Sequence, residues 1–89
     1  MAELIATGTT LVASADFTLS GDSSTLFLTA AAAQIPAGAV ALIELKSAAG
    51  TYHIVGKLLT ETPAAVLTGP GTYRVSRQVC ATAVGVDRV

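Results

Sequence analysis

The chain has 89 residues, a formal net charge of −1 at pH 7, 12% charged residues and one cysteine. This length predicts a single domain, 1–89, with a small core, and a single cysteine cannot form an intrachain disulfide. One histidine and one cysteine cannot complete a structural zinc site, and five scattered basic residues argue against the clustered basic face of a nucleic-acid-binding protein. No apolar run reaches the roughly 18 residues of a membrane span, and the start has no basic region, so we expect no signal peptide.

The N-terminal part predicts an edge segment followed by two strands. We expect residues 1–8 to form an edge strand or an extended arm that docks on a neighbour. Apolar residues at every second position of Thr9–Leu19 predict one strand with a single buried face. A turn at Ser20–Ser23 follows. In Thr25–Thr29, Phe27 points away from the two neighbouring leucines, which is typical of a central sandwich strand or of a subunit contact.

A short connection leads from these strands to a central hairpin. Ala30–Ala33 favours helix, but a proline follows closely, so we expect a single turn or an irregular connection. Pro36–Gly38 predicts a reversal. Ala39–Leu58 then contains two runs with a period of two, joined at Ala48–Gly50. This pattern predicts a β-hairpin around which the chain is organised.

The length of the hairpin loop determines how its two strands pair. A two-residue loop at 49–50 would place four pairs of residues opposite each other: Leu45 and Ile54, Lys46 and His53, Glu44 and Val55, and Leu42 and Lys57. The second strand is then expected to bury Tyr52, Ile54 and Leu58. Its outer face would mix charged and aliphatic residues.

The C-terminal third predicts three more short strands. Ala64–Thr68 follows a polar connection, and Thr72–Gln78 follows a Gly-Pro-Gly turn. Val79–Val89 closes the chain with Val84 and Val86 on one face. About seven or eight short strands with regularly spaced turns predict an all-β fold: a small antiparallel β-sandwich, immunoglobulin-like or jelly-roll, with a small β-barrel as the alternative.

The ionisable residues form no recognisable catalytic or metal-binding arrangement. His53 has no nucleophile or acid at a known motif spacing, and Cys80 has no basic cluster nearby to activate its thiol. Asp16 and Asp22 flank one turn, which is too few oxygens for a calcium site. We therefore expect no enzymatic activity, no metal and no cofactor.

The low share of charged residues indicates that part of the surface is covered by another subunit. Ordinary soluble domains carry about 25% charged residues, although a tightly packed domain rich in alanine is the simpler explanation. The candidate interface residues are Leu26, Phe27, Leu42, Val55, Arg74 and Arg77. The two arginines lie on opposite faces of one strand and would either be solvated or pair across an interface with acids such as Glu44 or Glu61.

The chain, rich in Ala, Thr, Gly and Val, also resembles a known class of protein through Ile35–Leu45, Gly69–Arg77 and Val84–Arg88. These segments resemble small accessory virion proteins of tailed phages, of the capsid decoration and head-fibre type. The resemblance covers most of the chain but carries no functional residues over. It implies a symmetric homo-oligomer, with a trimer favoured, assembled in the host cytoplasm. That assembly would bind a major capsid or tail protein and stabilise or decorate the virion.

A ligand-binding sandwich that recognises a glycan or a host-surface receptor is the alternative function. Tyr52, Tyr73 and the Gly-Pro-Gly loop would form its site. The chain has two tyrosines, two phenylalanines and no tryptophan, so an aromatic platform for sugars would be small. An enzyme ranks third.

Overall fold

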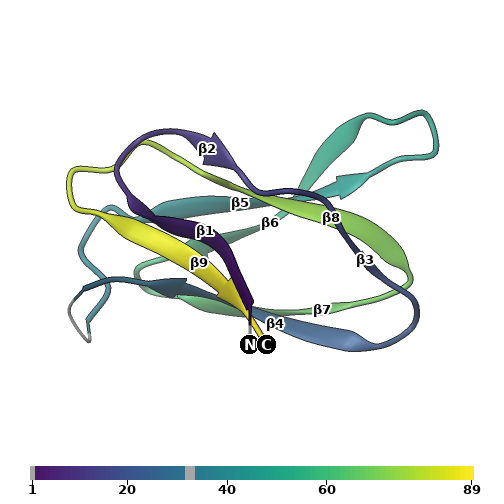
Figure 1. Ribbon diagram of the computed structural model, residues 1–89, viewed down its shortest axis with the longest axis horizontal. Helices are drawn as coiled ribbons and strands as arrows, with labels where there is room; N and C mark the ends of the chain where they lie inside the picture. The colour runs from purple at the N-terminus through teal and green to yellow at the C-terminus, as the bar shows by residue number, and fades with distance from the viewer. Residues whose placement is uncertain (1, 32–33) are drawn as a thin grey trace.

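All regular elements of the described residues, 2–31 and 34–89, are β-strands, and the computed structural model arranges them as a sandwich of two antiparallel sheets (Figure 1). Sheet A contains, in spatial order, β1 (Ala2–Gly8), β9 (Val84–Arg88), β4 (Ser23–Thr29) and β7 (Ala64–Thr68). Sheet B contains β2 (Val12–Ala13), β8 (Gly71–Arg77), β5 (Val40–Lys46) and β6 (Tyr52–Leu59), with β3 (Phe17–Leu19) also paired to β8.

This architecture confirms the expected all-β antiparallel sandwich. The alternative of a small barrel is wrong, because the strands form two separate sheets that do not close on each other. The N-terminal segment is an edge strand of sheet A, since β1 pairs only with β9, and the two ends of the described chain therefore lie side by side (Figure 1). Within the described residues there is no helix of the length and hydropathy that a membrane span requires.

The core lies between the two sheets and consists of the inward-facing residues of the strands. Its largest fully buried side chains are Leu19, Leu26, Ile43, Leu58, Val75, Val84 and Val86. Because every second residue of a strand points to the same face, Val84 and Val86 lie together on one face of β9, as predicted, and the structure shows that this face is buried. The β4 strand lies between β9 and β7 and is therefore a central strand of its sheet. Leu26 and Leu28 are buried in the core, whereas Phe27 lies on the opposite face and is half-buried.

The prediction of one continuous strand at Thr9–Leu19 is wrong, because the structure divides this segment into β2 and β3. The Ser14 hydroxyl accepts a hydrogen bond of 3.0 Å from the Val75 main-chain nitrogen, at a place where a regular ladder would use a main-chain carbonyl. The pairing with β8 shifts by one residue across this point. As a result Leu11 and Ala13 are exposed, whereas Phe17 in β3 is buried.

The connection before the hairpin is irregular where the structure describes it. Two residues of the helix-favouring stretch, 32–33, lie outside the described residues. The expected reversal is confirmed as a turn at Ala37 and Gly38, where Gly38 has a φ of +80°. The Thr60 hydroxyl donates a hydrogen bond of 2.6 Å to the Pro36 carbonyl, so this connection is held against the end of β6.

The β5–β6 hairpin exists as predicted, but three of its four predicted pairs are wrong. The observed partners are Lys46 and Tyr52, Leu45 and His53, Glu44 and Ile54, and Leu42 and Lys57. Gly50 has a φ of +88°, and its nitrogen donates to the Ser47 carbonyl; this geometry lengthens the loop by one residue and shifts the register. A bulge at Val55 then restores the predicted pairing of Leu42 with Lys57.

Candidate functional site

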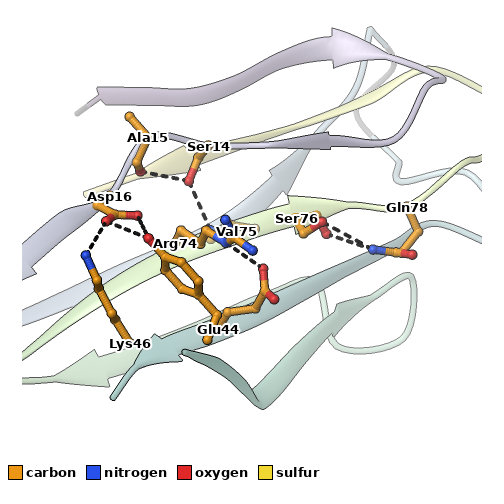
Figure 2. Close-up of polar contacts among 10 residues, drawn as sticks. Ser14, Ala15, Asp16, Glu44, Lys46, Arg74, Val75, Ser76 and Gln78 are labelled. Carbon is orange, nitrogen blue, oxygen red and sulfur yellow. Dashed lines mark hydrogen bonds and ion pairs between the residues drawn. The ribbon is translucent and has the colours of Figure 1, made fainter. Parts of the chain in front are cut away.

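A cluster of charged residues and one tyrosine lies on the outer face of sheet B at the base of the β5–β6 hairpin, which projects beyond the rest of the sandwich (Figure 1). We call it the hairpin-base cluster, and it consists of Asp16, Glu44, Lys46, Tyr52 and Arg74. The Tyr52 hydroxyl donates to the Asp16 carboxylate, with both oxygens at 2.7 Å. Lys46 Nζ lies 3.7 Å from Asp16 Oδ2, and Arg74 Nε lies 3.0 Å from Glu44 Oε1 (Figure 2).

The hairpin-base cluster is internally satisfied and acts as a brace. The Arg74 guanidinium carbon lies 3.6 Å from the centre of the Tyr52 ring, a cation–π arrangement, and each acid of the cluster pairs with a base. Asp16 belongs to the β2–β3 connection, whereas Lys46 and Tyr52 belong to the hairpin strands. The contacts therefore fix the hairpin to the opposite edge of sheet B.

The electrostatic state of the cluster agrees with this role. The pKa of Tyr52 lies above its ordinary value, first because its hydroxyl donates to Asp16, and also because of burial and the negative charge of Asp16. The pKa of Arg74 is raised mainly by its hydrogen bond with Glu44. A tyrosine in its neutral form is a hydrogen-bond donor, which agrees with the contact between the Tyr52 hydroxyl and the Asp16 carboxylate.

Replacing Asp16 with asparagine should lower the pKa of Tyr52 towards its ordinary value. With Asp16 present, the pKa of Tyr52 is higher in the folded state than in the unfolded state. Between these two pKa values the folded state therefore binds more protons than the unfolded state. The contribution of this group to stability is therefore complete below the ordinary tyrosine pKa of about 10 and is lost as pH rises through the folded pKa. Titration of tyrosinate absorbance measures the change.

The matched control for this titration is Asp22→Asn, because Asp22 accepts a hydrogen bond from the Ser20 nitrogen in an exposed turn. We expect this variant to titrate like the native protein. Identical curves for Asp16→Asn and the native protein would show that the Tyr52–Asp16 hydrogen bond has no effect on ionisation.

Two of the residues expected at an interface lie inside the subunit, which corrects the prediction for them. Leu26 is fully buried in the core, and Arg77 is only 3% exposed. The Arg77 guanidinium donates to the carbonyls of Ala6, Thr10 and Val84 at 2.6, 2.8 and 3.1 Å. Neither side chain offers the folded subunit a surface for a partner.

The other expected interface residues lie on the surface but do not form one patch. Phe27 lies on the outer face of sheet A, and Leu42 lies on the outer face of sheet B, both half-buried. Val55 is 53% exposed at the bulge of β6. Arg74 does pair with the predicted acid Glu44, but within the same chain. The expected interface therefore divides into two opposite faces.

The outer face of sheet A, called here the sheet A face, combines apolar side chains with two acids. Its residues lie opposite one another across the strands in two rows: Glu3, Asp87, Phe27 and Ala64, and then Val89, Thr25 and Val66. Val66 and Val89 are 65% and 63% exposed. Neither valine is among the interface residues predicted from the sequence. Ala64–Leu67 is apolar at every position, so alternation does not show on which side of this strand Val66 lies.

The outer face of sheet B, called here the sheet B face, consists of the hairpin-base cluster and a second row beside it. That row is Lys57, Leu42, Ser76 and Ala13. Ile54 lies opposite Glu44 and is 57% exposed. The alternation of the hairpin sequence predicts that Ile54 is buried, but the change of register in the hairpin turns it outward.

The remaining candidate residues are separate from one another. His53 is exposed on β6, Cys80 is half-buried with Sγ 3.6 Å from the Gly8 carbonyl oxygen, and Tyr73 is buried with its hydroxyl donating to the Thr68 carbonyl at 3.2 Å. Because it is buried, Tyr73 is not available to contact a ligand at the expected site. The described residues contain no group of three potential metal ligands and enclose no pocket.

The chain matches no protein family, and no curated protein or solved structure shows significant similarity to it.

Proposed function

We propose that the chain is a non-enzymatic structural protein of a tailed-phage virion, which self-associates and binds a capsid or tail surface that it stabilises or decorates. The observation that supports self-association most directly is the exposure of large apolar side chains on both outer faces of the sandwich, and the assignment to a virion rests on the resemblance of the sequence. Ile54, Val66 and Val89 each expose more than half of their surface.

These apolar faces are unusual for an isolated antiparallel sandwich. The outer face of such a sheet is normally polar, because water covers it, and monomeric proteins rarely expose large contiguous apolar patches. Here Phe27, Val66 and Val89 share the sheet A face, and Leu42 and Ile54 share the sheet B face. A second layer contributed by another subunit would bury these side chains.

Association would also stabilise a domain that has a small core and no disulfide. The single cysteine, Cys80, is a free thiol, and a domain of this size has a small core. Binding between folded subunits stabilises the folded state by mass action. A symmetric assembly on a capsid, with the trimer favoured by the resemblance of the sequence, uses this effect in a permanent complex.

Size-exclusion chromatography with light scattering tests the self-association. At high micromolar concentration we expect a mass that is a small multiple of the 8.9 kDa subunit, and three copies would agree with the favoured assembly. A stable subunit mass across the whole concentration range would contradict self-association.

Purified virions test the location. If the gene lies in a phage genome beside capsid or portal genes, mass spectrometry of gradient-purified particles should detect the chain as a component at many copies per particle. Particles that contain every other structural protein but lack this chain would contradict the proposed function.

A further inference from the structure

We propose that copies of the chain contact each other heterologously, with the sheet A face of one copy packed on the sheet B face of the next. This inference rests on the self-association proposed above and identifies the surfaces that it uses. The occupant of each face is a second copy of the chain, and the argument comes from the complementary charges of the two faces.

The sheet A face carries two neighbouring negative charges that nothing in the described subunit compensates. Glu3 on β1 and Asp87 on β9 are direct partners in the strand register. Like charges directly opposite each other on adjacent strands are destabilising. Among the described residues the ion pairs are Lys46 with Asp16 and Arg74 with Glu44, so this acid pair has no basic partner there. A positive charge from another molecule would relieve the repulsion.

The sheet B face carries an excess of positive charge. In the hairpin-base cluster the two acids and the two bases pair with each other. Lys57 is exposed on the same face, opposite Leu42, and forms no ion pair with a described acid. The sheet B face therefore presents one uncompensated positive charge beside Leu42 and Ile54.

The apolar parts of the two faces can be buried together in the same contact. Phe27 is the direct neighbour of Asp87 in sheet A, and Leu42 is the direct neighbour of Lys57 in sheet B. Each face thus places a half-buried apolar side chain one strand away from its uncompensated charge, at a spacing of about 4.8 Å. When Lys57 meets the acid pair, Phe27 and Leu42 lie within the same contact.

The charges favour a heterologous contact over an isologous one. Two sheet A faces packed together would leave both acid pairs without a basic partner, and two sheet B faces would leave both Lys57 side chains without an acid. Only the contact between unlike faces pairs the opposite charges. Such a contact produces a ring when its rotation closes and an open stack when it does not.

Charge reversal tests this contact. Lys57→Glu alone, and Glu3→Lys with Asp87→Lys, should each weaken association about ten-fold or more, because each places like charges together. The triple variant that combines all three reversals should regain association within about three-fold of the native protein, since the charges are exchanged between the faces. Light scattering as a function of concentration measures the association.

Two controls keep the test specific. Glu61→Lys makes the same charge change in the exposed loop after β6, outside both faces, and should associate like the native protein. Circular dichroism should show that all variants remain folded, because the exchanged side chains lie on the outer faces.

The outcomes separate this inference from the proposed function. Native protein that associates but is unaffected by the single reversals, or a triple variant that stays dissociated, would overturn the heterologous contact and leave self-association standing. A native protein that remains a single subunit would overturn both.

Discussion

Replacing Arg77 with methionine should lower the free energy of unfolding by about 3–5 kcal/mol. The guanidinium is buried and donates to main-chain carbonyls of Ala6, Thr10 and Val84, and to the Thr10 hydroxyl at 3.3 Å. Methionine fills a similar volume but leaves these acceptors without donors. Since small domains have a total stability of about 5–15 kcal/mol, this single change should remove a large share of it.

The position of Arg77 explains why the effect should be so large. Arg77 belongs to β8 in sheet B, whereas Ala6 lies in β1 and Val84 in β9, both in sheet A. The side chain thus joins the two sheets at the edge where the chain passes from β1 to β2. The fit is close, since a Cβ added at Gly8 would lie 2.9 Å from the guanidinium Nη1.

Urea unfolding followed by circular dichroism measures the loss, and two other variants define its cause. Arg77→Lys keeps the positive charge but cannot reproduce the planar set of donors, so it should lose an intermediate amount, about 1–3 kcal/mol. Arg74→Met is the matched control on the outer face of the same strand and should change stability much less. Equal losses for Arg77→Met and Arg74→Met would contradict the bracing role of the buried guanidinium.

Arg77 also shows where sequence reasoning stops. Its separation from Arg74 correctly predicts that the two side chains lie on opposite faces of β8. An arginine on an inner face is expected to need an acid, yet the Arg77 guanidinium is satisfied by carbonyls from positions distant in the chain. Main-chain acceptors have no signature in the sequence, so the burial of Arg77 could not be predicted.

The register of the hairpin illustrates a second limit. Alternation predicts that β5 and β6 are strands, and Gly50 marks their turn. Whether the loop has two or three residues depends on which residue adopts the left-handed conformation. A shift of one residue reverses the face of the side chains that follow, here as far as the bulge at Val55, which restores the predicted register. Ile54 is consequently exposed. Its place on the sheet B face could not be predicted from the sequence.

The residues of the candidate surfaces could be predicted where a strand has an apolar residue at a position that its alternation assigns to the outer face. Phe27 stands out because it interrupts the alternation of β4, and the structure places it on the sheet A face. Val66 does not stand out, because its neighbours in β7 are also apolar. The acid pair of Glu3 and Asp87 is formed by two strands from opposite ends of the chain, so only the topology reveals it.

Alanine substitutions at the adjacent residues Leu26 and Phe27 should separate folding from association. Leu26 is fully buried between the sheets, and shortening it creates a cavity that the core cannot fill completely. Leu26→Ala should therefore lower the free energy of unfolding by about 2–5 kcal/mol. Phe27 points to the opposite side of β4, so Phe27→Ala should cost about 1 kcal/mol or less in the isolated subunit.

Association should respond in the reverse order. Phe27→Ala removes the largest apolar side chain of the sheet A face, and we expect the association constant to fall about ten-fold or more, as for a central interface aromatic. Leu26→Ala should associate normally at temperatures where it remains folded. Denaturant unfolding at low protein concentration, combined with light scattering at high concentration, measures both quantities for each variant. A Leu26→Ala protein that retains native stability but fails to associate would place Leu26 at the subunit contact and contradict the buried position that the structure gives it.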